Sequence, residues 1–188
     1  MNERAEFFLA HQLRSDEGAT LGEVFSFLSG LCFRGKLAYA RAFARPLGIA
    51  NGIAVITADR GLVSPDTIVR IDDLRAFAAV PIDPAEARYR EPLARDAAAL
   101  AAQLPETGRV ILLGSIASDK YAAILRAALG ERLFFPQSFV GRGDMSRGGL
   151  LLRAVDAGEE LTYVPVMGSA RRGVRPTKLP PRQTRTED

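Results

Sequence analysis

Tryptophan is absent from the sequence, and cysteine and histidine occur once each, at Cys32 and His11. A single cysteine excludes an internal disulfide and any metal site built from several thiolates. With one histidine as well, a zinc site would need carboxylates for most of its ligands, so we expect no metal site. No apolar run approaches the roughly 20 residues of a membrane span. The first residues also lack a small-residue cleavage site. We therefore expect no contact with a membrane and a cytoplasmic location.

Positive charge is in small excess and lies at one end of the chain. The 188 residues carry 25 Lys and Arg against 22 Asp and Glu, a net charge of +3. Residues 171–188 hold six basic and two acidic residues, so they carry +4 and residues 1–170 carry −1. We expect residues 1–167 to form one domain and residues 168–188 a basic, disordered tail, which has too little apolar surface to fold. Arginines in residues 171–188 could bind nucleic acid weakly through its phosphates.

Patterns typical of buried strands alternate with patterns typical of helices. Residues 52–57 and 110–113 are unbroken apolar runs, too short for helices and typical of strands buried on both faces. Residues 6–13 fit a strand or a short helix, and the contiguous apolar residues favour a strand. Taken together, the patterns predict a three-layer, Rossmann-like α/β sandwich with a mostly parallel sheet of about five strands, whose two central strands are the runs named first.

Helix starts and stops are clearest in two places. Thr20 and Glu23 have the spacing of a capping box, in which each side chain binds a free amide at the start of a helix. Ser29 and Gly30 interrupt the helix that follows. Further along, residues 121–128 carry apolar side chains at the spacing of one helix face, and Gly130 ends that helix.

Ligands of open parallel sheets bind beyond the carboxyl ends of the strands. The turn at residues 114–118 could offer amides and hydroxyls to an anion, or could serve only as a turn and a helix cap. Glycine inside a helix costs roughly 1 kcal/mol relative to alanine. Glycines 148 and 149 therefore indicate close backbone approach to a ligand or to the sheet, unless the glycines of residues 139–150 serve only turn geometry. The predicted ligand-binding residues are Arg60, Gly114, Ser115, Ser118, Gly141, Arg142, Gly143 and Arg147.

Three residues are candidates for acid–base chemistry. Asp59 or Asp144 could act as a general base, with nearby arginines stabilising negative charge. Asp59 could equally pair with Arg60 or with solvent. His11 could be a general acid or base, although a lone histidine is more often structural.

Two stretches carry a resemblance. LCFRGKLAYARAF (residues 31–43) and AVITADRGLVSPDTIVRID (residues 54–72) resemble an uncharacterised group of small bacterial and phage α/β domains, which share a helix and a strand-loop of the form ILSA-x-x-GL-x-PD. That group opens with a cysteine-serine-lysine motif, where this chain has residues 9–12, LAHQ. The resemblance implies an α/β fold and no established activity.

These observations leave three functions open, in this order. The first is binding of a phosphorylated or nucleotide-like small molecule at the carboxyl edge of the sheet, with or without catalysis. The second is association with nucleic acid through the basic tail, and the third is a non-catalytic, partner-binding module. The sequence has no Walker A or G-x-G-x-x-G pattern, so it indicates no particular cofactor.

Overall fold

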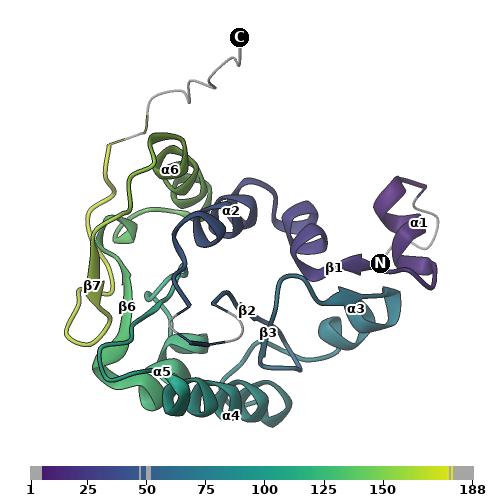
Figure 1. Ribbon diagram of the computed structural model, residues 1–188, viewed down its shortest axis with the longest axis horizontal. Coiled ribbons are helices and arrows are strands. Elements are labelled where there is room, and N and C mark those ends of the chain that lie inside the picture. The colour runs from purple at the N-terminus through teal and green to yellow at the C-terminus, as the bar shows by residue number, and fades with distance from the viewer. Residues whose placement is uncertain (1–5, 47, 50–51, 178, 180–188) are drawn as a thin grey trace.

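Helices dominate the residues that the computed structural model describes, which are 6–46, 48–49, 52–177 and 179 (Figure 1). The helices are α1 (Phe8–Arg14), α2 (Leu21–Phe43), α3 (Ile71–Ala78), α4 (Ala87–Gln103), α5 (Asp119–Leu129) and α6 (Asp144–Ala157). Short 3-10 turns, η1 (Gly130–Arg132) and η2 (Gln137–Phe139), flank one strand. The strands are β1 (Ala19–Thr20), β2 (Val55–Ile56), β3 (Leu62–Val63), β4 (Ile68–Val69), β5 (Val110–Ile111), β6 (Leu133–Pro136) and β7 (Tyr163–Pro165).

The strands form three small sheets instead of one large sheet. β1 pairs with β4 and β2 with β3, both antiparallel. The third sheet has the order β5-β6-β7, in which β5 and β6 are parallel and β7 is antiparallel to β6. The prediction of a Rossmann-like three-layer sandwich with about five mostly parallel strands is therefore wrong.

Both runs expected at the centre of the sheet lie elsewhere. β5 is an edge strand of its sheet and is only half-buried, while β2 belongs to a two-stranded hairpin with β3. A short apolar run predicts burial, but it does not say whether helices or neighbouring strands provide the cover. Here helices provide much of it, and the central strand of the third sheet is β6, whose Leu133 and Phe135 are almost fully buried.

Local signals at the first two helices give one wrong prediction and two confirmed ones. The segment favoured as a strand is α1, which buries Ala10 and Leu13, three residues apart on one helix face. The capping box is confirmed, because the Thr20 side chain accepts from the Glu23 amide at 3.2 Å and the Glu23 carboxylate accepts from the Thr20 amide at 3.0 Å. The interruption at Gly30 is confirmed as well, since its φ of 53° kinks α2.

Helices α2 and α6 touch through their backbones. A Cβ atom on Gly35 would lie 2.5 Å from the carbonyl oxygen of Gly148, and one on Gly148 would lie 2.5 Å from the carbonyl oxygen of Leu31. Neither position can hold a larger side chain without moving one helix away from the other. The close approach inferred from the glycine pair is therefore an approach to α2, made by α6, which begins at Asp144.

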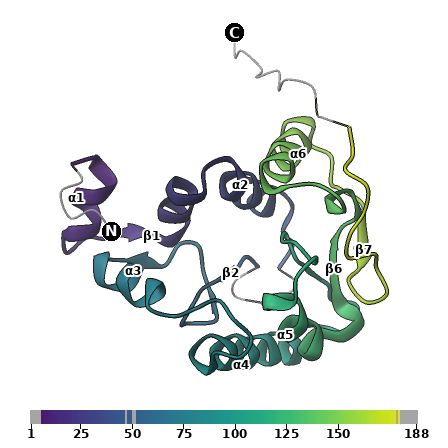
Figure 2. The same ribbon diagram turned by 180° about the vertical axis from the view of Figure 1, so that it is seen from behind.

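Two hydrophobic clusters fill the interior. The larger one lies between α4, α5, α6 and β6, and its most buried members include Leu93, Leu133, Phe135, Phe139 and Leu151. The smaller one joins α1, β1, β4 and α3. Figures 1 and 2 place α1 and β7 at opposite ends of the longest axis. Among the described helices, none combines the length and apolar character needed to cross a membrane.

Replacing Gly148 with alanine should destabilise the protein by about 1–3 kcal/mol, the usual cost of overpacking. The added methyl group would press on the backbone of α2, which outweighs the better helix propensity of alanine. The matched control is Gly149→Ala, because a Cβ there meets only the mobile end of Arg153, at 3.1 Å. That variant should be neutral or more stable by up to ~1 kcal/mol. Urea unfolding measures both, and equal effects would contradict the backbone contact.

Candidate functional site

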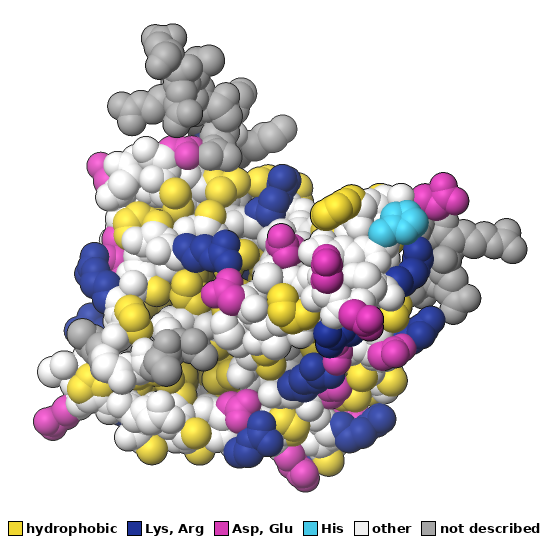
Figure 3. Space-filling model, turned by 45° about the vertical axis from the view of Figure 1, so that its right-hand side comes forward, with side chains coloured by type: hydrophobic (Ala, Val, Ile, Leu, Met, Phe, Trp, Pro, Cys, Tyr) yellow, Lys and Arg dark blue, Asp and Glu magenta, His cyan; other side chains and the backbone are white. Residues whose placement is uncertain are grey.

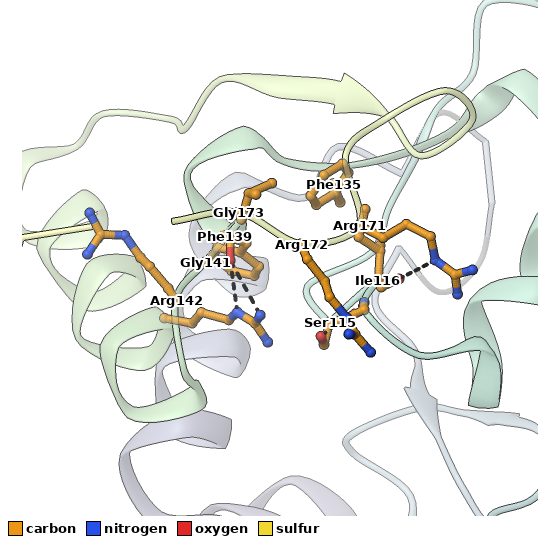
Figure 4. A pocket seen from close by; sticks show the side chains of 13 residues that line it. Ser115, Ile116, Phe135, Phe139, Gly141, Arg142, Arg171, Arg172 and Gly173 are labelled. Carbon is orange, nitrogen blue, oxygen red and sulfur yellow. Dashed lines mark hydrogen bonds between the residues drawn. The ribbon is translucent and has the colours of Figure 1, made fainter. Parts of the chain in front are cut away.

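A pocket of about 280 Å³ lies beyond the carboxyl ends of the parallel strands β5 and β6. The turn that follows β5 forms one side of it, and the segment that follows β6 forms another (Figure 4). The third side comes from residues 171–173 near the carboxyl end of the chain. The lining residues are Gly114, Ser115, Ile116, Ala117, Phe135, Phe139, Val140, Gly141, Arg142, Arg147, Arg171, Arg172 and Gly173.

The lining contains four arginines and no carboxylate. Two carboxylates stand just outside it, where Asp144 pairs with Arg147 at 3.2 Å and Asp119 pairs with Arg171 at 2.6 Å. The guanidinium groups therefore outnumber the neighbouring carboxylates by two. Since arginine keeps its charge at any ordinary pH, the lining carries a net positive charge.

Arg147 is the most buried arginine of the pocket, with only 9% of its surface exposed. Its Nε and Nη2 atoms donate to the carbonyl oxygen of Phe139 at 3.4 and 3.3 Å, and Nη1 donates to Asp144 at 3.2 Å. A guanidinium has five N–H bonds, so two of them have no partner among the described residues. A buried charge with unfilled donors is costly, and an anion in the pocket would satisfy them.

The side chains of Arg142 and Arg172 point in different directions relative to Ser115. The Arg142 guanidinium points away from Ser115 and donates to the Ser138 carbonyl at 3.0 Å and the Ser146 hydroxyl at 3.2 Å (Figure 4). Arg172 extends toward Ser115 and has no ion pair or hydrogen bond with any described residue (Figure 4). Arg147 keeps two N–H bonds and Arg172 all five without a partner among the described residues, and both line the pocket, whereas Arg142 is directed away from it. Arg147 and Arg172 are therefore the candidates for contact with a ligand.

The turn after β5 is held by a tyrosine of α5. The Tyr121 hydroxyl accepts a hydrogen bond from the Ser115 amide at 2.7 Å, and a Cβ on Gly114 would lie 2.8 Å from the same oxygen. Burial raises the pKa of the Tyr121 phenol, which therefore stays protonated at neutral pH. The tyrosine ring leaves no room for a side chain at position 114, which accounts for the glycine there. The Ser115 hydroxyl, which accepts from the Ala117 amide at 3.3 Å, borders the pocket.

Three further predicted site residues lie next to the pocket and outside its lining. Ser118 precedes α5 at the cap position but its side chain makes no capping hydrogen bond. Gly143 occupies the same position before α6. The side chain of Asp144 is 70% exposed and is paired with Arg147.

Asp59 and Arg60 lie in the turn between β2 and β3 and do not line the pocket. Arg60 forms an ion pair with Asp73 of α3, stands 3.7 Å from Asp59, and lies over the ring of Phe77 at 5.2 Å. One carboxylate oxygen of Asp59 is buried without a hydrogen bond. Arg60 links the hairpin to α3 through Asp73, and its approach to Asp59 is the pairing of these two residues considered from the sequence.

His11 also lies away from the pocket. It is on α1, at the opposite end of the protein from β7, and the one histidine is visible at the surface in Figure 3. Its Nε2 atom is 3.0 Å from the carbonyl oxygen of Glu6, and His11 is not among the residues that line the pocket. His11, Asp59 and Asp144 are therefore not brought together. Within the described residues, no group of three metal-ligating side chains is found either.

Sequence reasoning missed Arg171, Arg172 and Gly173, because they fall in the predicted tail. This stretch has no apolar periodicity, the signal by which a packed segment is usually recognised. It is held instead by Arg171, whose Nε donates to the Ile116 carbonyl at 3.2 Å. The Arg-Arg-Gly sequence was the available signal, since glycine permits close backbone contact beside two charged side chains.

No protein family model, no curated protein sequence and no solved structure matches the chain.

Asp73→Asn should make the protein less stable near neutral pH and less sensitive to acid. Hydrogen bonds from Arg60 and from the Arg70 amide hold the pKa of the Asp73 carboxyl below its ordinary value of 3.8. A lowered pKa contributes stability that is present above pH 3.8 and is lost as the pH falls through the lowered value.

Unfolding curves between pH 7 and pH 2 should therefore differ between the wild type and Asp73→Asn at neutral pH and converge in acid. The control is Asp72→Asn, since Asp72 is 83% exposed in a surface ion pair and should change stability little. A constant difference at every pH would contradict the role of the Asp73 charge.

Proposed function

We propose that the pocket binds a small phosphorylated or nucleotide-like molecule through its anionic group. One observation carries this proposal: the lining holds four arginines and no carboxylate, and buried Arg147 keeps two N–H bonds without a partner among the described residues. Guanidinium groups bind phosphate and carboxylate oxygens through two parallel hydrogen bonds.

The position of the pocket supports the same function. It lies at the carboxyl ends of two parallel strands, where α/β proteins commonly bind ligands, although the pair here belongs to a small sheet. The turn at residues 114–117 leads into α5, whose amino end carries a partial positive charge. Each feature favours a negative ligand.

The proposal is for binding, without an assigned reaction. Among the described residues, the lining contains no carboxylate and no histidine that could move a proton. Asp144 and Asp119, which stand just outside the lining, are engaged by Arg147 and Arg171. The apolar part of the lining, which includes Ile116, Phe135 and Val140, would cover the rest of a small ligand.

Arg147→Gln should weaken binding of inorganic pyrophosphate by about ten- to a hundredfold in isothermal titration calorimetry. Hydrogen bonds to charged groups contribute about 1.5–3 kcal/mol, and each 1.4 kcal/mol is a factor of ten in affinity. The control is Arg88→Gln, which removes the same charge from an exposed position of α4, where Arg88 pairs only with Glu86 in the described structure.

Arg147→Lys keeps the charge and loses the fork of donors, so it should bind with intermediate affinity if the glutamine variant folds poorly. Wild-type affinity in a folded Arg147 variant would contradict the proposal, as would a wild type that binds neither pyrophosphate nor nucleotides. Nucleic acid is the alternative ligand, and a short oligonucleotide that binds while pyrophosphate does not would favour it.

A further inference from the structure

Residues 169–174, here called the C-terminal strap, run across the pocket and are fastened at three places. At its start, the Ser169 hydroxyl donates to the carbonyl oxygen of Pro165. In the middle, Arg171 donates to Ile116 at 3.2 Å and pairs with Asp119 at 2.6 Å. At its end, the backbone of residues 173–174 lies against the segment that follows β6. The strap therefore joins the two sides of the pocket that follow β5 and β6.

The end of the strap packs against the backbone of Gly141. The φ of 74° at Gly141 lies in the left-handed region that favours glycine. A Cβ atom on Gly141 would lie 2.2 Å from the carbonyl oxygen of Val174, and one on Gly173 would lie 2.6 Å from a methyl group of Val140. Two glycines thus allow backbone to pack on backbone, and a side chain at Gly141 would push the strap away.

Arg172 is the residue that this arrangement directs into the pocket. Its neighbour Arg171 turns outward to Ile116, whereas Arg172 extends toward Ser115 (Figure 4). It is exposed and has no partner among the described residues, although the strap around it is fastened on both sides. Arg147 faces the pocket from α6, so two guanidinium groups from separate segments line one small space.

Resting on the proposed function, we infer that the ligand is a phosphoryl dianion held between Arg147 and Arg172. Its binding stabilises the strap in the position described above, across the pocket. Two guanidinium groups with unfilled donors match the two charges and the several oxygens of a phosphomonoester or diphosphate. A lone carboxylate has one charge and two oxygens, and it would satisfy Arg147 alone. The strap is then part of the binding site, and its position depends on occupancy.

Pyrophosphate titrations of matched variants test this inference. Arg172→Gln should weaken binding about tenfold or more, as expected for loss of a charge-assisted hydrogen bond. Arg175→Gln is the control, since Arg175 is exposed in the same stretch and does not line the pocket. Gly141→Ala should also weaken binding, although it removes no arginine, because it displaces the strap that carries Arg172. Malonate, a dianion without a phosphoryl group, should bind at least tenfold more weakly than pyrophosphate.

Limited digestion with trypsin reports on the strap itself. In the wild type, pyrophosphate should slow cleavage after Arg171 and Arg172, as measured by mass spectrometry of the released fragment. In Gly141→Ala, cleavage should be fast and pyrophosphate should change it little. If Arg147→Gln loses binding while Arg172→Gln and Gly141→Ala bind as the wild type does, the strap is not part of the site and the proposed function stands. If malonate binds as well as pyrophosphate, the phosphoryl class is wrong.

Discussion

Backbone contact between α2 and α6, at Gly35 and Gly148, is the constraint on which the rest of the structure depends. No side chain separates the two helices there, so the position of α6 is set by α2 with little freedom. Arg147 immediately precedes Gly148, and the contact therefore also sets where the buried guanidinium stands. The two glycines that allow the helices to touch therefore also fix the position of Arg147 beside the pocket.

The positive charge of that pocket comes partly from a buried arginine, whose burial is costly. Arg147 is held by one carbonyl oxygen and one exposed carboxylate, which leaves part of its donor capacity unused among the described residues. Such a group costs stability unless a partner arrives. Arg171, whose side chain is 42% exposed, pairs with Asp119, and in doing so it fastens the strap that carries Arg172. A ligand with negative charge would accept hydrogen bonds from both Arg147 and Arg172.

Several features could be read from the sequence because their causes are local. The capping box of Thr20 and Glu23, the kink at Gly30 and the helix after residue 118 depend on nearby residues alone. The large parallel sheet could not be predicted correctly, because apolar runs such as residues 52–57 do not reveal what covers them. Gly148 was identified as a point of close approach, but its partner on α2 was not, since Gly35 lies in an ordinary helical pattern. The strap escaped prediction because its contacts are made by backbone and arginine, without apolar periodicity.

If one anion contacts α6 and the strap together, a crystal structure of the protein with pyrophosphate will show it. Pyrophosphate should lie in the pocket beyond β5 and β6, with its oxygens within hydrogen-bond distance of both Arg147 and Arg172. Pyrophosphate bound elsewhere, for example at Arg60, or bound in the pocket without contact to Arg147, would show that α6 and the strap do not share a ligand.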